Sequence, residues 1–170
     1  MTRLATYASF VRISHTVFAL PFALVGALLA SRTGVAAWSW PRIAWILVCM
    51  VTARSAAMGF NRLADAAHDA KNPRTAMREL PSGRMRRGEA VAFVVVMSLA
   101  FVAAARMVGP LAFALSPVAL AIVFLYSLAK RFTHYAQLFL GLAMAVAPVG
   151  GWIAMGGPLG PEPFLLGLAI

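Results

Sequence analysis

The sequence is poor in acidic residues, and its aspartates are confined to one place. Five Asp or Glu stand against 15 Lys or Arg among the 170 residues, which gives a net charge of +10. The only aspartates are Asp65 and Asp69. Charged residues make up 12% of the chain, whereas an average soluble domain carries about 25%. This composition excludes an ordinary soluble domain.

The chain has one cysteine, Cys49, in the middle of an apolar run. A single thiol can form neither an internal disulfide nor a cysteine-ligated metal site. We also do not expect a cleavable leader, because the first apolar block continues through Pro21 to Ala30 without a small-residue cleavage site. That block is expected to be a retained helix.

Hydrophobic residues make up 62% of the chain and gather in six blocks. The blocks are residues 13–30, 43–60, 90–107, 111–129, 136–155 and 164–170. A helix that crosses a bilayer needs about 20 residues, which the first five blocks approach and the sixth does not. None shows the alternation of β-barrel strands. The sequence predicts an all-α, multi-pass transmembrane helical bundle in the lipid bilayer, with about five complete helices and the start of a sixth.

The basic residues predict the orientation of this bundle. Lys and Arg concentrate in the cytoplasmic connections of membrane proteins. With the N-terminus placed inside, the connections hold 11 basic residues on the cytoplasmic side and 3 on the other. We therefore expect the N-terminus and the long polar segment at about 61–89 to be cytoplasmic. Nucleic acid is not an expected partner, because no known nucleic-acid-binding module accompanies the charge.

The sixth block is only seven residues long and reaches Ile170 without a polar cap. A helix of that length cannot cross a bilayer. We expect residues 1–170 to be the N-terminal part of a single transmembrane domain in which the sixth helix continues. The next connection would then return to the cytoplasmic side.

A group of polar residues stands at the end of the second block. Asn61, Asp65 and Asp69 are spaced four residues apart, in a segment crowded with Arg and Lys. If the second helix continues through residue 69, they share one face, at steps of about 40° and about 6 Å. Two carboxylates and an amide oxygen suit Mg²⁺, which commonly shares its coordination shell with substrate phosphates. The nearby guanidinium groups would meet the remaining charge of a diphosphate.

A plainer interpretation is that the aspartates only form ion pairs at a helix end. Asp65 could pair with Arg62, and Asp69 with Arg62 or Lys71. Such surface pairs are common and contribute little to stability. Spacing alone does not decide between the two interpretations.

Two features inside the apolar blocks also suggest specific positions. Arg54 lies within the second block, where a charge is costly unless it faces a cavity or an acid. Gly141, Gly150 and Gly151 in the fifth block are small enough to allow close helix packing.

The polar motifs resemble those of a known family. The pattern N-x-x-x-D-x-x-x-D at 61–69 is followed by NPRT at 72–75 and RELPSG at 78–83. Together they resemble the first aspartate-rich motif of the UbiA superfamily of intramembrane prenyltransferases. RISHTVFALPFALVGALLA at 12–30 resembles the first helix of that family, and YSLAKRFTHYAQLFLGLAMAVAPVGGWIA at 126–154 resembles its fourth-to-fifth helix region. The resemblance covers nearly the whole chain. It is nearest to the bacterial 4-hydroxybenzoate and menaquinone-pathway polyprenyltransferases of quinone biosynthesis.

This resemblance implies a Mg²⁺-dependent aromatic polyprenyltransferase of the bacterial inner membrane. Such an enzyme transfers a polyprenyl group from an isoprenyl diphosphate to an aromatic acid acceptor, such as 4-hydroxybenzoate. Asn61, Asp65 and Asp69 are the implied Mg²⁺ ligands, with Asp65 and Asp69 as the catalytic pair. The residues implied to bind the diphosphate are Asn61, Arg74, Arg78, Tyr126, Lys130 and Arg131.

The sequence departs from the family in one respect. The second aspartate motif, which the family carries on a later cytoplasmic connection, is absent from these residues. The expected truncation accounts for this absence, and we expect residues 1–170 alone to be inactive.

A transporter is a weaker alternative, because transporter sites concentrate near the membrane midplane. A CDP-alcohol phosphatidyltransferase would need an Asp-Gly run that does not occur. A non-catalytic relative stays open, although the intact Asn61, Asp65 and Asp69 argue against it.

Overall fold

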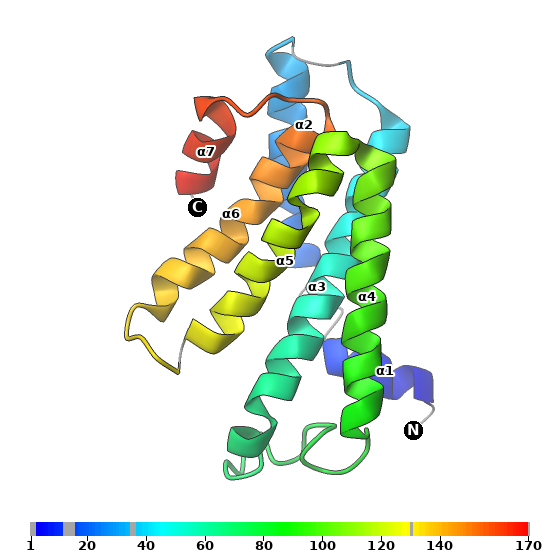
Figure 1. The fold of residues 1–170 in the computed structure, drawn as a ribbon, viewed down its shortest axis with the longest axis vertical. Coiled ribbons are helices and arrows are strands. Elements are labelled where there is room, and N and C mark those ends of the chain that lie inside the picture. Colours follow the sequence, from blue (N-terminus) through cyan, green and yellow to red (C-terminus); the bar gives the residue numbers. More distant parts are fainter. Residues whose placement is uncertain (1–2, 12–15, 35–36, 130, 170) are drawn as a thin grey trace.

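The protein is described by a computed structural model over residues 3–11, 16–34, 37–129 and 131–169, in which all regular structure is helical (Figure 1). The seven helices are α1 (Arg3–Val11), α2 (Thr16–Arg32), α3 (Trp40–Asp69), α4 (Arg87–Val108), α5 (Pro110–Ala129), α6 (Ala136–Ala154) and α7 (Pro161–Leu168). The described residues contain no strand. The all-α prediction is confirmed.

Four helices, α3 to α6, are long and apolar enough to cross a membrane. Helix α2 is also apolar but has 17 residues, and α7 has 8. Each apolar block of the sequence contains a helix in the described residues, and the helix of the sixth block is short. Helix α1 is an addition that the apolar blocks did not predict.

The bundle has two chemically different ends. The segment between α3 and α4, residues 70–86, lies with α1 and the turn between α5 and α6 at one end, here called the loop end (Figure 1). Three further connections, which join α2 to α3, α4 to α5 and α6 to α7, lie at the opposite or far end. Most basic residues belong to segments at the loop end, and Trp38 and Trp40 lie at the far end. The charged end of the bundle is thus the end at which α3 finishes.

Small residues allow α2 and α6 to pack backbone against backbone. A Cβ atom on Gly26 of α2 would overlap the Pro148 carbonyl oxygen, and one on Gly151 of α6 would overlap the Ala23 carbonyl oxygen. Gly141 and Gly150 have nothing within 4 Å of an added Cβ. Of the three glycines that the sequence suggested, only Gly151 lies in a close helix crossing.

The main buried cluster joins α2, α3 and α6 toward the far end. It contains Ala23, Ala27, Ala30, Ile43, Ile46, Trp152, Ile153, Ala154 and Met155. The Arg42 guanidinium closes this region by donating to the Met155 carbonyl oxygen at 2.7 Å. This packing fixes α3 as the rigid element whose other end carries the polar residues.

Helix α1 covers the loop end through an aromatic contact. Phe10 is fully buried and meets Phe93 of α4 edge to face, with ring centroids 5.8 Å apart. Tyr7 stacks on the same ring at 5.6 Å. Met85, the penultimate residue of the 70–86 segment, joins this second cluster. Helix α1 and the 70–86 segment are therefore packed together.

Candidate functional site

Helix α3 carries the three motif residues without interruption. It ends at Asp69, so Asn61, Asp65 and Asp69 occupy successive turns at the loop end. A regular helix with this spacing places them on one face. The condition attached to the metal hypothesis, a helix that continues through residue 69, is confirmed. Residues 61–69 of the long polar segment belong to α3, and residues 70–86 form the loop itself.

Helix α5 lies against α3 at the first of these turns. The Asn61 side-chain amide donates a hydrogen bond to the buried Ser127 hydroxyl at 3.3 Å. The rings of Phe60 and Phe124 stack beside it, with centroids 4.5 Å apart. Because the amide nitrogen makes the contact with α5, the amide oxygen of Asn61 is the atom that remains for a cation.

Asp65, one turn later, meets the turn between α5 and α6. Arg131 Nη2 lies 3.8 Å from Asp65 Oδ1 and also donates to the Ala64 carbonyl oxygen. The Arg131 side chain is 40% exposed. A loose ion pair in contact with water contributes little to stability. The Asp65 carboxylate can therefore exchange or share this partner at low cost.

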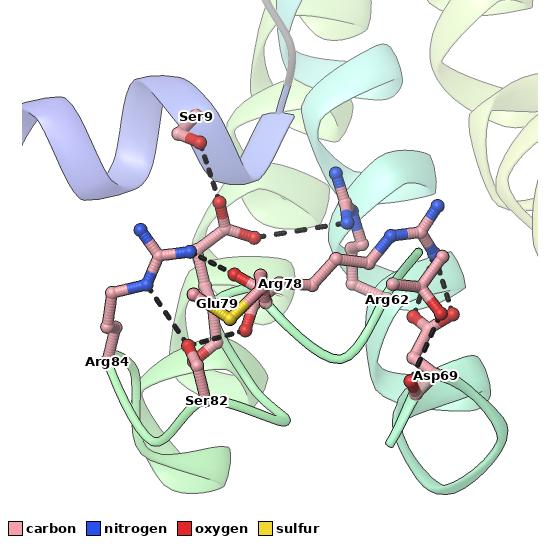
Figure 2. A network of polar contacts seen from close by, with 9 residues as sticks. Ser9, Arg62, Asp69, Arg78, Glu79, Ser82 and Arg84 are labelled. Atoms are coloured by element: carbon pink, nitrogen blue, oxygen red, sulfur yellow. Dashed lines mark hydrogen bonds and ion pairs between the residues drawn. The ribbon is translucent and has the colours of Figure 1, made fainter. Parts of the chain in front are cut away.

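Asp69 ends the helix in a closer contact. Arg78 Nη1 lies 2.8 Å from both carboxylate oxygens of Asp69 (Figure 2). The Thr75 hydroxyl donates to the Asp69 carbonyl oxygen at 3.1 Å. The Asp69 side chain is buried, whereas the Arg78 side chain is 31% exposed. The loop thus returns to α3 and brings a guanidinium group to the last carboxylate of the motif.

The plainer interpretation, pairing at a helix end, is partly correct, because Asp65 lies beside Arg131 and Asp69 beside Arg78. Asp69 pairs with Arg78 rather than with Lys71, which is exposed. Arg62 lies 3.9 Å from Glu79 Oε2. Sequence reasoning gave neither Glu79 nor Ser127 a role. Glu79 could have been noticed as an acid next to Arg78 in the RELPSG run, whereas Ser127 has no such signal.

Two of the three remaining candidates lie in the described residues. Tyr126 is half-buried on α5, next to Ser127. Arg74 is exposed in the loop, where its backbone N–H is bonded to Asn72 Oδ1 at 3.0 Å. Lys130 lies outside the described residues. The structure therefore brings Asn61, Asp65, Asp69, Arg78 and Arg131 together and leaves Arg74 on the surface.

Arg54 continues the same face of α3 into the apolar part of the bundle. It precedes Asn61 by seven residues, which is about two helical turns. Its Nε atom is buried without a hydrogen-bond partner among the described residues. Buried polar groups in native proteins are nearly always hydrogen-bonded. An unpartnered guanidinium nitrogen is therefore a candidate contact for a ligand.

The donor chemistry of this face fits Mg²⁺ as a shared site rather than a closed one. The described residues contain no group of three His, Cys, Asp or Glu that could hold a metal ion alone. Mg²⁺, however, usually takes one or two protein carboxylates and completes its shell with water and substrate phosphates. Asp65 and Asp69, with the Asn61 amide oxygen, supply such a partial set. Arg131 and Arg78 lie beside these two carboxylates.

Comparison with known proteins identifies the family of this chain. Residues 19–170 match the UbiA prenyltransferase family. The chain is 34% identical to a 4-hydroxybenzoate octaprenyltransferase of Vibrio parahaemolyticus over 135 residues, which is 79% of this chain and 47% of that protein. It is 32% identical to a protein of the same name from a Marinomonas species over 161 residues, or 94% of this chain and 56% of that protein. The chain thus spans about half the length of the curated relatives it matches.

Solved structures agree with this assignment. A UbiA homolog from Aeropyrum pernix superposes with a TM-score of 0.81 at 34% identity, over 91% of this chain and 56% of that one. A UbiA homolog from Archaeoglobus fulgidus bound to DMAPP and Mg²⁺ shares the fold with a TM-score of 0.76 at 18% identity, over 95% and 59%. The chain belongs to the UbiA prenyltransferase family.

Proposed function

We propose that these residues form the Mg²⁺- and diphosphate-binding part of a membrane prenyltransferase. The enzyme would transfer a polyprenyl group from an isoprenyl diphosphate to an aromatic acid. The observation that carries the proposal is the position of Asp65 and Asp69 on one face of α3, each beside an arginine from another segment. The activity named for the Vibrio relative supports the substrate class, and the Mg²⁺ bound to the Archaeoglobus homolog supports the metal.

Each group on this face has a distinct task in binding. Mg²⁺, when bound, supplies positive charge that stabilises the departing diphosphate. Asp65, Asp69 and the Asn61 oxygen would hold that ion. Arg78 and Arg131 lie close enough to the carboxylates to reach phosphate oxygens that the same ion binds, and a planar guanidinium suits two-point contact with phosphate. Tyr126, Lys130 and Arg74 are further proposed diphosphate contacts.

The membrane setting follows from the same residues. We propose a multi-pass protein of the bacterial cytoplasmic membrane with the loop end facing the cytoplasm, because cytoplasmic connections carry the excess of Lys and Arg. The bacterial source of the curated relatives supports this location. The diphosphate would then enter from water, while the prenyl chain lies among the apolar helices.

The proposal is tested by binding in the presence and absence of the metal. The 170-residue chain in detergent micelles should bind geranyl diphosphate when Mg²⁺ is present, and EDTA should abolish binding. Isothermal titration calorimetry measures both states, and geraniol serves as the ligand control without the diphosphate. Metal-independent binding of geranyl diphosphate, or equal binding of geraniol, would contradict the proposal.

Binding and turnover are expected to separate in this chain. The second aspartate motif of the family is absent from these residues. Residues 70–170 contain three acids, Glu79, Glu89 and Glu162, and no aspartate. We therefore propose that residues 1–170 alone bind the diphosphate but do not transfer the prenyl group. Release of diphosphate from radiolabelled geranyl diphosphate with 4-hydroxybenzoate would show turnover and refute this part.

Arg54 is proposed as the contact for the carboxylate of the acceptor. Arg54→Gln should weaken 4-hydroxybenzoate binding at least about tenfold, since one charge-assisted hydrogen bond contributes about 1.5–3 kcal/mol. Binding of geranyl diphosphate should change little. The measurement is a titration of 4-hydroxybenzoate into chain already saturated with Mg²⁺ and geranyl diphosphate.

The matched control for Arg54 is Arg106→Gln, which removes a cation from the last turn of α4 at the far end. It should leave binding of both ligands unchanged. Equal losses of 4-hydroxybenzoate affinity in the two variants would mean that net charge, rather than Arg54, attracts the acceptor.

A further inference from the structure

A buried ion pair beside the binding face has no part in the chemistry proposed above. Glu79 lies in the 70–86 loop and is 3% exposed, and Arg62 on α3 is 6% exposed. Arg62 Nη1 lies 3.9 Å from Glu79 Oε2, and the Ser9 hydroxyl of α1 donates to Glu79 Oε1 at 2.6 Å (Figure 2). Glu79 therefore connects three segments that are distant in the sequence.

Burying charges in this way is costly. Two ions lose their water on burial, and a well-packed apolar pair is often at least as stable. The pair is thus poorly explained as a contribution to stability alone. Buried ionic groups can instead determine which of several alternative packings forms, because an incorrect partner leaves a charge uncompensated.

The residue that precedes Glu79 suggests which packing the buried ion pair determines. Arg78 directly precedes Glu79, and Figure 2 shows its side chain extending to Asp69 while the Glu79 carboxylate turns toward Ser9 and Arg62. The two adjacent loop residues thus contact the last two turns of α3 with opposite charges.

The charge pattern on α3 is complementary to that of the loop. Arg62 and Asp69 are seven residues apart, so they lie within about 20° of each other on the helix, two turns apart. The loop presents Arg78 and Glu79 in consecutive positions. An arrangement in which Arg78 and Glu79 exchanged partners would place Arg against Arg and Glu against Asp, and like charges at such distances repel.

The loop is also closed on itself around Glu79. The Met85 N–H donates to the Glu79 carbonyl oxygen at 3.0 Å, and the Ser82 N–H donates to the Arg78 carbonyl oxygen at 3.0 Å. Fixing the Glu79 side chain therefore fixes a compact turn, and with it the backbone from which Arg78 extends.

We propose that Glu79, held by Arg62 and Ser9, is a positioning residue that places Arg78 at Asp69 and so at the diphosphate. This inference rests on the proposed function. Glu79 itself touches neither the metal nor the substrate and acts only through Arg78.

The test is a double-mutant cycle on binding of Mg²⁺ and geranyl diphosphate. Glu79→Gln should weaken binding about tenfold, which is the low end of the loss seen when an outer partner of a binding group is removed. In an Arg78→Ala background the same substitution should have no further effect, because the group that it positions is gone. Non-additive effects of this kind identify residues that act through each other.

A second measurement does not depend on the ligand. Hydrogen–deuterium exchange of the peptide 77–85 should be faster in Glu79→Gln than in the unsubstituted chain, while exchange in α6 stays the same. Glu89→Gln is the control, since Glu89 is an acid of the same end that accepts a hydrogen bond from the Arg86 N–H at 3.0 Å. It should leave both diphosphate binding and exchange of 77–85 unchanged.

Three results separate the possible failures. Unchanged exchange in Glu79→Gln would overturn the inference, because Glu79 would not hold the loop. Equal losses of affinity with and without Arg78 would also overturn it, because Glu79 would then not act through Arg78. Absence of Mg²⁺-dependent binding by the unsubstituted chain would overturn the proposed function itself, and this inference with it.

Discussion

Replacing Asp65 with asparagine is expected to reduce Mg²⁺-dependent binding of geranyl diphosphate by at least about a hundredfold, since loss of even an outer partner of a metal ligand costs 10–100-fold in affinity. Asparagine keeps the size of the side chain and one oxygen but removes the charge that holds the ion. In the unliganded protein, the substitution weakens a loose ion pair with Arg131, which is in contact with water. Circular dichroism during heating checks that the variant remains folded.

Asp69→Asn should lower the affinity for Mg²⁺ and geranyl diphosphate to a similar extent, with an added effect on the protein. Arg78 loses the carboxylate to which it lies 2.8 Å away, so the loop is also expected to loosen. Calorimetric titration measures the affinity, and circular dichroism during heating separates a binding defect from unfolding.

The control for both substitutions is Glu162→Gln. Glu162 lies in the first turn of α7, away from the loop end (Figure 1), and its loss removes one negative charge without touching the site. Full binding by Asp65→Asn, or an equal loss in Glu162→Gln, would contradict the assignment of the aspartates.

Gly151→Ala is expected to destabilise the bundle strongly. The new methyl group would overlap the Ala23 carbonyl oxygen, which is backbone and cannot rotate away. Overpacking usually costs about 1–3 kcal/mol, and we expect a value at or above the upper end of this range. Thermal unfolding in detergent, followed by circular dichroism, measures the loss.

The neighbouring glycine provides a matched comparison. Gly150→Ala places the same methyl group on the same helix, where nothing lies within 4 Å. It should be neutral, or stabilising by up to about 1 kcal/mol through the higher helix propensity of alanine. Equal unfolding temperatures for the two variants would refute the close crossing of α2 and α6.

The sequence predicted the bundle well because apolar blocks long enough to cross a bilayer leave few alternatives. The same reasoning could not choose between Gly150 and Gly151, since the choice depends on the rotation of α6 against α2. Helix α1 was also missed, although Tyr7, Phe10 and Val11 share one helical face. The helical pattern of this short basic segment is too weak to distinguish it from an unstructured segment.

The candidate site likewise has residues that the sequence could predict and contacts that it could not. Asn61, Asp65 and Asp69 were predictable because their spacing depends only on one continuous helix. Their partners were not, because Arg78 reaches Asp69 through the return of a loop and Arg131 reaches Asp65 from another pair of helices. Glu79 could be noticed in the sequence as an acid next to Arg78, but its contacts with α1 and α3 could not be predicted, because both segments are distant along the chain.

The most direct test of the central claim uses the rarity of aspartate. Because Asp65 and Asp69 are the only aspartates in the chain, labelling aspartate with ¹³C at the side-chain carboxyl carbon places every aspartate carboxylate signal at the site. With geranyl diphosphate present, Mn²⁺ in place of Mg²⁺ should broaden both signals, and Asp65→Asn should remove one of them. Two sharp signals that persist at saturating Mn²⁺ and geranyl diphosphate would show that the aspartates do not hold the metal, and the proposed function would fall.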